Sequence, residues 1–117
     1  MTRIRQVSAR RDKELLDRRV VYAQVVLRDK GQCVLCSNQA VDVHEVCPRS
    51  MFGAKTKGKC YTLRNMAAIC RDCHGKVVSR EGRHKLLVVL HDRFGYSYDD
   101  EPWRSYYYGG QDAAQVP

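Results

Sequence analysis

Two Cys-x-x-Cys pairs constrain the fold more than any other feature of the sequence. Cys33 and Cys36 form the first pair, and Cys70 and Cys73 form the second. Each pair lets two thiolates face one ion, and four thiolates complete the closed tetrahedral shell of a structural zinc site. A single pair also occurs in redox motifs, but two pairs separated by a domain-sized insert indicate zinc. The sequence therefore predicts one four-cysteine zinc site that holds two segments together.

Length and composition favour zinc over disulfides. A chain of 117 residues predicts one domain with a limited core, and cross-links help a core of this size. The charged N-terminus lacks the apolar stretch of a signal peptide, and no apolar run is long enough to cross a membrane. We therefore expect a reducing, cytoplasmic setting and no membrane partner. Cys47 and Cys60 do not fit the spacing of the pairs and are interpreted as incidental, although either could be reactive.

The chain is strongly basic, with 21 Lys and Arg residues against 13 Asp and Glu residues. A zinc ion bound by four thiolates would not reverse this balance. A positive field favours polyanions, so DNA is the expected partner. The alternative is that the charge serves solubility alone.

The pattern along the chain predicts a single α+β domain over residues 1–117. Residues 1–11 are expected to form a basic arm, and residues 12–31 a helix that stops at Gly31. Two short apolar runs, "VDVHEV" and "NMAAIC", are expected to be strands, which the zinc site would bring together as an antiparallel pair. Further helices are expected over residues 71–82, which include Cys73, and over residues 82–94. Residues 109–117 are expected to be a loose tail.

The order of the motifs resembles the HNH endonucleases that carry a zinc ribbon. The stretches "CVLCSNQAVDVHEVCPRS" and "RNMAAICRDCHGKV" carry the resemblance, over about residues 33–78. The shared elements are a Cys-x-x-Cys pair, the sequence His44-Glu45-Val-x-Pro, Asn65, and a second pair followed at once by His74. The flanks are more loosely similar to small HNH proteins of phages and prophages. The resemblance implies a ββα-metal core, in which two strands and a helix surround one divalent ion.

The resemblance also implies a role for each matching residue. His74 matches the last histidine of the motif, a metal ligand, and Asn65 matches the asparagine that orients the loop and the general base through backbone hydrogen bonds. Aligned on the following Val-x-Pro, His44 takes a ligand position and Glu45 the position of the base. The implied activity is metal-dependent hydrolysis of DNA phosphodiester bonds, leaving 5′-phosphate and 3′-hydroxyl ends. The catalytic ion would be Mg²⁺ or another divalent metal such as Mn²⁺, Ni²⁺ or Zn²⁺.

Glu45 is a departure from the family, because the general base is usually a histidine. In one reading Glu45 is the base, since a carboxylate can take a proton from water. In the other, His44 is the base, and Asp42 or Glu45 helps to hold the metal. Neighbouring strand residues point to opposite faces, so both reach one site only at a strand end or bulge, which the nearby Pro48 favours. We expect a shared site; a third alternative is that the substitution has silenced catalysis.

The loop after this motif is rich in cations. It lies beside the expected site and therefore supplies candidate phosphate contacts. These candidates are Arg49, Lys55, Lys57 and Lys59.

Two other classes of function remain open at this stage. A non-catalytic zinc module that binds DNA or a protein would need the cysteines and the basic surface, but not the ordered His44, Asn65 and His74. A redox protein that uses its cysteine pairs predicts no tightly held metal. The order of the polar residues favours the nuclease over both.

Overall fold

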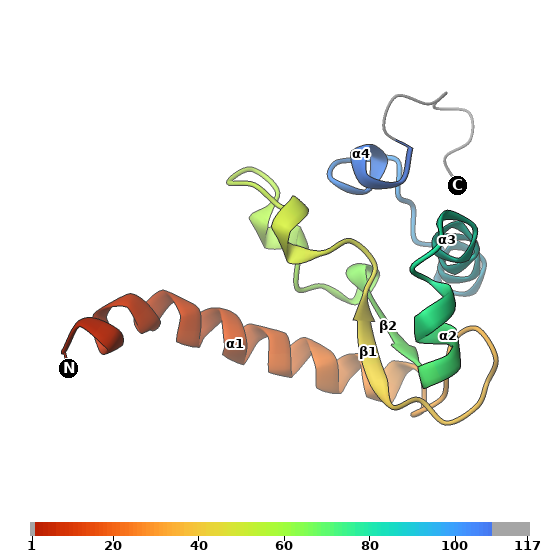
Figure 1. Cartoon of the computed structure of the whole chain (residues 1–117), viewed down its shortest axis with the longest axis horizontal. Helices are drawn as coiled ribbons and strands as arrows, with labels where there is room; N and C mark the ends of the chain where they lie inside the picture. The colour runs from red at the N-terminus through yellow and green to blue at the C-terminus, as the bar shows by residue number, and fades with distance from the viewer. Residues whose placement is uncertain (1, 109–117) are drawn as a thin grey trace.

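A two-stranded antiparallel sheet lies at the centre of the computed structural model, which describes residues 2–108. Strand β1 spans Asp42–Glu45 and strand β2 spans Met66–Ile69 (Figure 1). The register pairs Asp42 with Ile69 at one end and Glu45 with Met66 at the other. The two strands predicted from the apolar runs are therefore confirmed.

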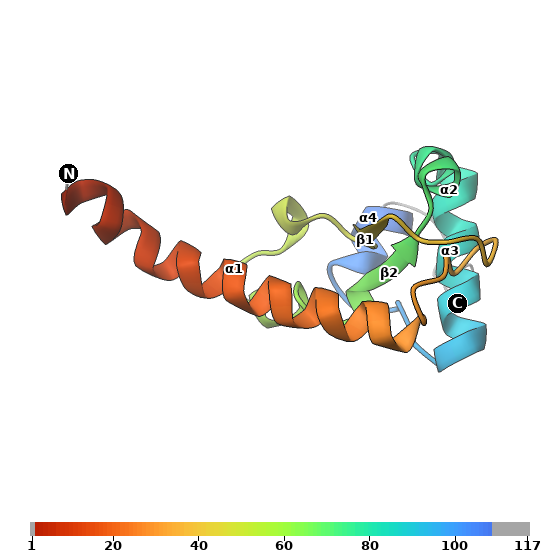
Figure 2. The same cartoon turned by 90° about the horizontal axis from the view of Figure 1, so that it is seen from below.

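A long helix, α1 (Thr2–Arg28), lies along one face of the sheet and continues well past it (Figures 1 and 2). The expected basic arm is corrected, because residues 2–11 are helical. This stretch contains no glycine or proline and is rich in arginine, a good helix former. The helix ends near the expected stop, where Lys30 and Gly31 adopt φ angles of 56° and 69°. Such left-handed residues commonly end helices.

Helices that follow β2 pack on the other side of the sheet (Figure 1). Helix α2 (Arg71–Lys76) begins directly after Cys70, α3 spans Arg80–Phe94, and α4 spans Trp103–Tyr108. Helix α3 matches the helix predicted over residues 82–94 and ends at Gly95, whose φ is 75°. The sequence did not predict α4, and the tail expected over residues 109–117 lies outside the described residues.

The link between the strands is the expected loop, tightened by three short 3₁₀ turns. These turns are Arg49–Met51, Lys57–Lys59 and Leu63–Asn65. Across residues 2–108, no helix combines the length and the apolar character that crossing a membrane requires.

Asp29 and Arg28 fasten the end of α1 to β2. The Asp29 carboxylate accepts hydrogen bonds from the Ala68 backbone N–H at 3.0 Å and from the Arg28 guanidinium at 2.9 Å. Arg28 also donates to the carbonyl oxygens of Leu63 and Met66 at 2.6 and 2.7 Å. The Asp29 side chain is fully buried, so these partners replace the water that it lost on folding.

We expect Asp29→Ala to lower the free energy of unfolding by about 3 kcal/mol, because it leaves the buried N–H of Ala68 without an acceptor and the Arg28 guanidinium without its carboxylate partner. Chemical denaturation followed by circular dichroism measures this loss. Asp17→Ala is the matched control, since Asp17 lies on the same helix and makes no ion pair among the described side chains. The control should change stability by less than about 0.5 kcal/mol. Equal losses in the two variants would contradict the anchoring role.

Candidate functional site

The four cysteines of the two pairs come together, as predicted. Their sulfur atoms all lie within 4.8 Å of one another, and the sulfurs of Cys36 and Cys70 are 3.5 Å apart. Zinc–sulfur bonds of about 2.3 Å in a tetrahedron place the sulfurs about 3.8 Å apart, so the cluster has the size that zinc requires. Among the side chains that the structure describes, those of residues 13–108, no other group of three or more potential ligands is this compact. The cluster could therefore hold a metal ion such as zinc.

The thiols of this cluster differ in how easily they ionise. Burial raises the pKa of the Cys33 thiol, but the backbone N–H groups of Cys70, Leu35 and Cys36 outweigh burial and lower this pKa to about 7. Burial, followed by hydrogen bonds to neighbouring thiols, raises the pKa of Cys73 to about 12. Four thiolates this close repel one another. A divalent cation would allow all four to ionise together.

The other two cysteines, Cys47 and Cys60, lie apart from this cluster. Burial raises the pKa of the Cys47 thiol to about 12 and that of the Cys60 thiol to about 11. Few thiolates therefore form at neutral pH, and the thiolate is the form that reacts and binds metals. Their burial agrees with the interpretation that neither cysteine contributes to a site.

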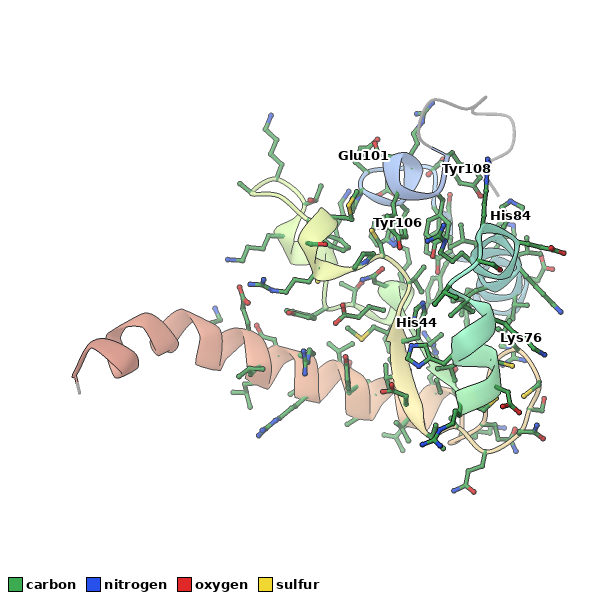
Figure 3. The ribbon with its side chains drawn as sticks, in the orientation of Figure 1. His44, Lys76, His84, Glu101, Tyr106 and Tyr108 are labelled. Atoms are coloured by element: carbon green, nitrogen blue, oxygen red, sulfur yellow. The ribbon has the colours of Figure 1, made fainter. Side chains whose placement is uncertain are left out.

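His44 of β1 and His74 of α2 face each other. Their ring centroids are 5.2 Å apart, and Figure 3 shows the His44 ring pointing from β1 toward α2. Asp42 lies beside them, with its Oδ2 atom 3.5 Å from Nδ1 of His74. The side chains of Asp42 and His74 are 53% and 42% exposed, so this face is open to solvent.

The strand register explains why these side chains meet. His44 pairs with Ala67 and Asp42 pairs with Ile69, and both partners pack into the core that contains α3 and α4. Cross-strand partners lie on the same face of a sheet, so His44 and Asp42 project toward that side. Helix α2 starts directly after β2 and carries His74 onto the same face.

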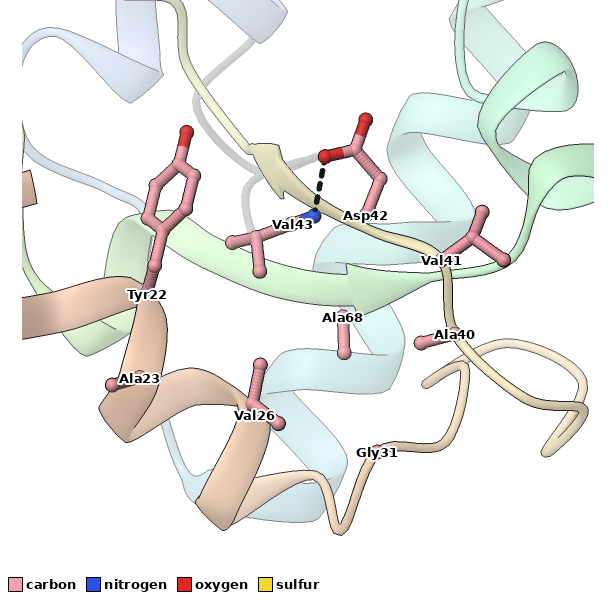
Figure 4. Close-up of a pocket in the computed structure, with 9 residues that line it drawn as sticks. All are labelled: Tyr22, Ala23, Val26, Gly31, Ala40, Val41, Asp42, Val43 and Ala68. Carbon is pink, nitrogen blue, oxygen red and sulfur yellow. Dashed lines mark hydrogen bonds between the residues drawn. The ribbon is translucent and has the colours of Figure 1, made fainter. Parts of the chain in front are cut away.

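The opposite face of the sheet is turned toward α1. Val43 of β1 and Ala68 of β2 line a mostly apolar cavity of about 350 Å³ between the sheet and α1, together with Val26 of that helix. Figure 4 shows the Ala68 side chain pointing toward α1 while Asp42 points away from it. The two faces of β1 therefore have different neighbours.

Glu45 lies on this second face. It pairs with Met66, which packs against Val25 of α1. Burial raises the pKa of Tyr22 on α1, and the charge of Glu45 adds to that rise. Because β1 continues through Glu45 with consecutive pairing, strand alternation separates Glu45 from His44. Glu45 is the last residue of β1, so the expected shared site at a strand end stays a prediction, although the register turns the two side chains to opposite faces.

His44 is held in its neutral form. Burial lowers the pKa of His44 to about 4, and the charge of His74 acts in the same direction, while Asp42 opposes the shift. At pH 7 the ring therefore carries a free lone pair. A neutral imidazole can bind a metal ion or accept a proton from water.

Asn65 is fully buried and ties the loop to the segment after β1. Its Oδ1 atom accepts from the backbone N–H of Cys47 at 2.8 Å, and its Nδ2 atom donates to the carbonyl oxygens of Cys47 and Cys60 at 3.0 and 2.9 Å. The indole N–H of Trp103 donates to the same Oδ1 atom at 2.8 Å. The resemblance implied backbone hydrogen bonds of this kind, whereas the contact from α4 is new.

Glu14 of α1 pairs with two of the candidate phosphate contacts. Arg49 donates to the Glu14 carboxylate at 2.5 Å, and Lys57 lies 3.4 Å from it. The hydrogen bond from Arg49 lowers the pKa of Glu14, so the carboxylate stays charged. These ion pairs lie at a cavity of about 870 Å³ between α1 and the loop.

The two remaining candidates differ from each other. Lys59 lies 2.9 Å from the Asp100 carboxylate, which also pairs with Arg64. Lys55 makes no ion pair in the part of the chain that the structure describes. The loop cations are therefore only partly available to a ligand.

The assembled face offers two chemical capabilities. Asp42 and His74 present a carboxylate oxygen and an imidazole nitrogen, which are suitable ligands for a divalent ion. His44 presents a neutral base beside them. The chain matches no family model, no curated protein and no solved structure.

Proposed function

We propose that this chain is a metal-dependent DNA endonuclease of the HNH type, built on a structural zinc site. One observation carries the proposal: His44 and His74 face each other beside Asp42, in a strand–strand–helix arrangement next to the four cysteines. The resemblance of residues 33–78 to zinc-ribbon HNH endonucleases supports the same reading. A zinc module without catalysis would require the cysteines but not this pair of histidines.

In the proposed reaction, Asp42 and His74 hold the divalent ion and His44 is the general base. The ion would stabilise the negative charge that develops on the phosphate oxygens. Neutral His44 accepts a proton from water while the water oxygen forms a bond to phosphorus in line with the departing 3′ oxygen. The P–O3′ bond breaks, and the departing 3′ oxygen takes a proton from solvent, which gives a 5′-phosphate and a 3′-hydroxyl. Asn65 keeps the segment after β1 in place through its backbone hydrogen bonds.

DNA is the proposed substrate because the chain is basic and the site is open. The loop cations lie on the segment that follows β1, where they can contact phosphates on either side of the scissile bond. Lys55 is the candidate without an internal ion pair among the described residues. Arg49 and Lys57 would have to exchange Glu14 for phosphate.

Plasmid cleavage by zinc-loaded protein tests the proposal, with Mg²⁺, Mn²⁺, Ni²⁺ and Zn²⁺ supplied in turn. We expect nicked or linear products with at least one of these ions, and a rate at least about a hundredfold lower for His74→Ala, because charge stabilisation at the phosphate is lost. His84→Ala is the matched control, since His84 is an exposed histidine of α3 whose ring lies against Tyr108.

The control variant should cut at the wild-type rate. A wild-type protein that binds DNA but cuts with none of these ions would refute the nuclease and favour the non-catalytic zinc module. Equal rates for His74→Ala and His84→Ala would also refute the assigned site.

A further inference from the structure

Helix α4 is linked to the segment that follows β1 through a buried tryptophan, which bonds to Asn65, and Asn65 in turn bonds to Cys47. The Trp103 side chain is fully buried, and its indole N–H donates to Oδ1 of Asn65. The Arg64 guanidinium lies 3.9 Å from the centre of the indole ring, and Tyr98 packs against the ring edge at a centroid distance of 5.9 Å. The indole is therefore held in place from several sides. Its N–H fixes the amide whose Oδ1 also accepts from the backbone of Cys47.

A tyrosine on the same helix makes a second contact to this segment. The Tyr107 hydroxyl donates a hydrogen bond to the carbonyl oxygen of Val46. Val46 is buried, and its own N–H donates to the carbonyl oxygen of Asn65 at 2.7 Å. Burial, with a smaller contribution from Tyr106, raises the pKa of Tyr107, so the hydroxyl keeps its proton. It therefore remains a donor at any working pH.

The two contacts form one clamp. Trp103 and Tyr107 are four positions apart, so they project from the same side of α4. One fixes Asn65, and the other fixes Val46, the residue that directly follows β1. His44 lies on β1 two residues before Val46, so a shift of the clamped segment would also move the His44 ring against His74.

We propose that Tyr107 and Trp103 of α4 are positioning residues, which clamp the segment after β1 and so set His44 against His74. Neither residue touches the reacting atoms. The catalytic part of this inference rests on the proposed function, whereas the clamp itself can be measured without any reaction.

Tyr107→Phe tests the clamp, because it removes one hydroxyl and keeps the ring. Tyr106→Phe is the matched control: it makes the same change on the same helix, where the hydroxyl instead meets Arg83 at 3.4 Å. We expect Tyr107→Phe to lower kcat about tenfold with KM for DNA unchanged, since a small misplacement of a reacting group slows the chemical step. The control should stay within about twofold of wild type. In parallel, amide hydrogen exchange at Val46 and Cys47 should quicken in Tyr107→Phe but not in Tyr106→Phe.

Trp103→Phe provides an independent variant, because it retains an aromatic ring and removes the N–H donor. It should shift the exchange at Cys47 and the value of kcat in the same direction as Tyr107→Phe. If the wild-type protein is active and kcat is unchanged in both Tyr107→Phe and Trp103→Phe, the positioning role is refuted, even if the exchange quickens. The proposed function would then still stand. Inactive wild-type protein with faster exchange in Tyr107→Phe would refute the proposed function and leave the clamp standing. Unchanged exchange in both variants would remove the clamp whatever the activity.

Discussion

Cys36→Ser is expected to unfold the domain rather than only slow a reaction. Cys36 is the exposed member of its cluster, so the substitution opens no cavity in the core. The expected loss therefore comes from the missing fourth thiolate. Zinc binding to structural sites contributes roughly 10–16 kcal/mol, which is comparable to or larger than the whole stability of a typical domain, roughly 5–15 kcal/mol. Without the ion, the cluster would not hold the segment before β1 to the end of β2.

Elemental analysis and circular dichroism measure this outcome. Wild-type protein should carry about one tightly bound zinc ion per chain, the capacity of one four-thiolate shell, and a strong chelator should unfold it. Cys60→Ala is the control, because Cys60 is buried but lies outside the cluster. It should keep its zinc and lose only about 1 kcal/mol from a small cavity. A folded, zinc-free wild-type protein would contradict the assignment of zinc.

His44→Ala and Glu45→Gln are expected to differ strongly, although the two residues are neighbours. Removing a general base typically costs a factor of about 10² to 10⁴ in rate, so His44→Ala should lose cleavage on that scale, and added Mn²⁺ should not restore it. Glu45→Gln should stay within about threefold of wild type, because Glu45 lies on the face turned toward α1. Asp42→Asn should instead raise the metal concentration required. Single-turnover cleavage over a series of Mn²⁺ concentrations separates these effects.

The opposite pattern would restore the reading in which Glu45 is the base. In that case Glu45→Gln would abolish cleavage, and Mn²⁺ would partly rescue His44→Ala, which would then have lost only a ligand. The pH profile is the weaker discriminator. A base must be deprotonated, so the rate should fall as the pH drops through the pKa of His44, about 4, and ordinary carboxylates titrate in the same region.

Short-range chemistry in the sequence predicts much of this fold. The spacing of the cysteine pairs predicts that four sulfurs meet, because each pair presents two thiolates to one ion and a structural zinc ion binds four. The two strands follow from short apolar runs bounded by polar residues. Gly95 marks the end of α3 because its left-handed conformation costs a glycine little.

Long-range contacts explain what the sequence could not predict. The side on which Glu45 lies depends on the register between β1 and β2, which local patterns do not specify. The sequence offered Asp42 and Glu45 alike as possible metal ligands, and it took the position of α2 to place His74 beside Asp42. The hydrogen bonds from α4 join residues that are 38 and 61 positions apart, and no local signal marks Trp103 or Tyr107 as donors.

The ion pairs at Glu14 change what the basic composition means for DNA binding. A free lysine or arginine releases a condensed counterion from DNA when it contacts a phosphate, and this release makes affinity depend on salt. Arg49 and Lys57 already have a carboxylate partner, so a phosphate that binds them displaces Glu14 instead of adding a new contact. These two cations therefore add little to the free energy of DNA binding, because each only exchanges a carboxylate for a phosphate. The freed Glu14 carboxylate also remains beside the DNA and repels it. The total of 21 cationic side chains therefore overstates the attraction that this surface can exert on DNA.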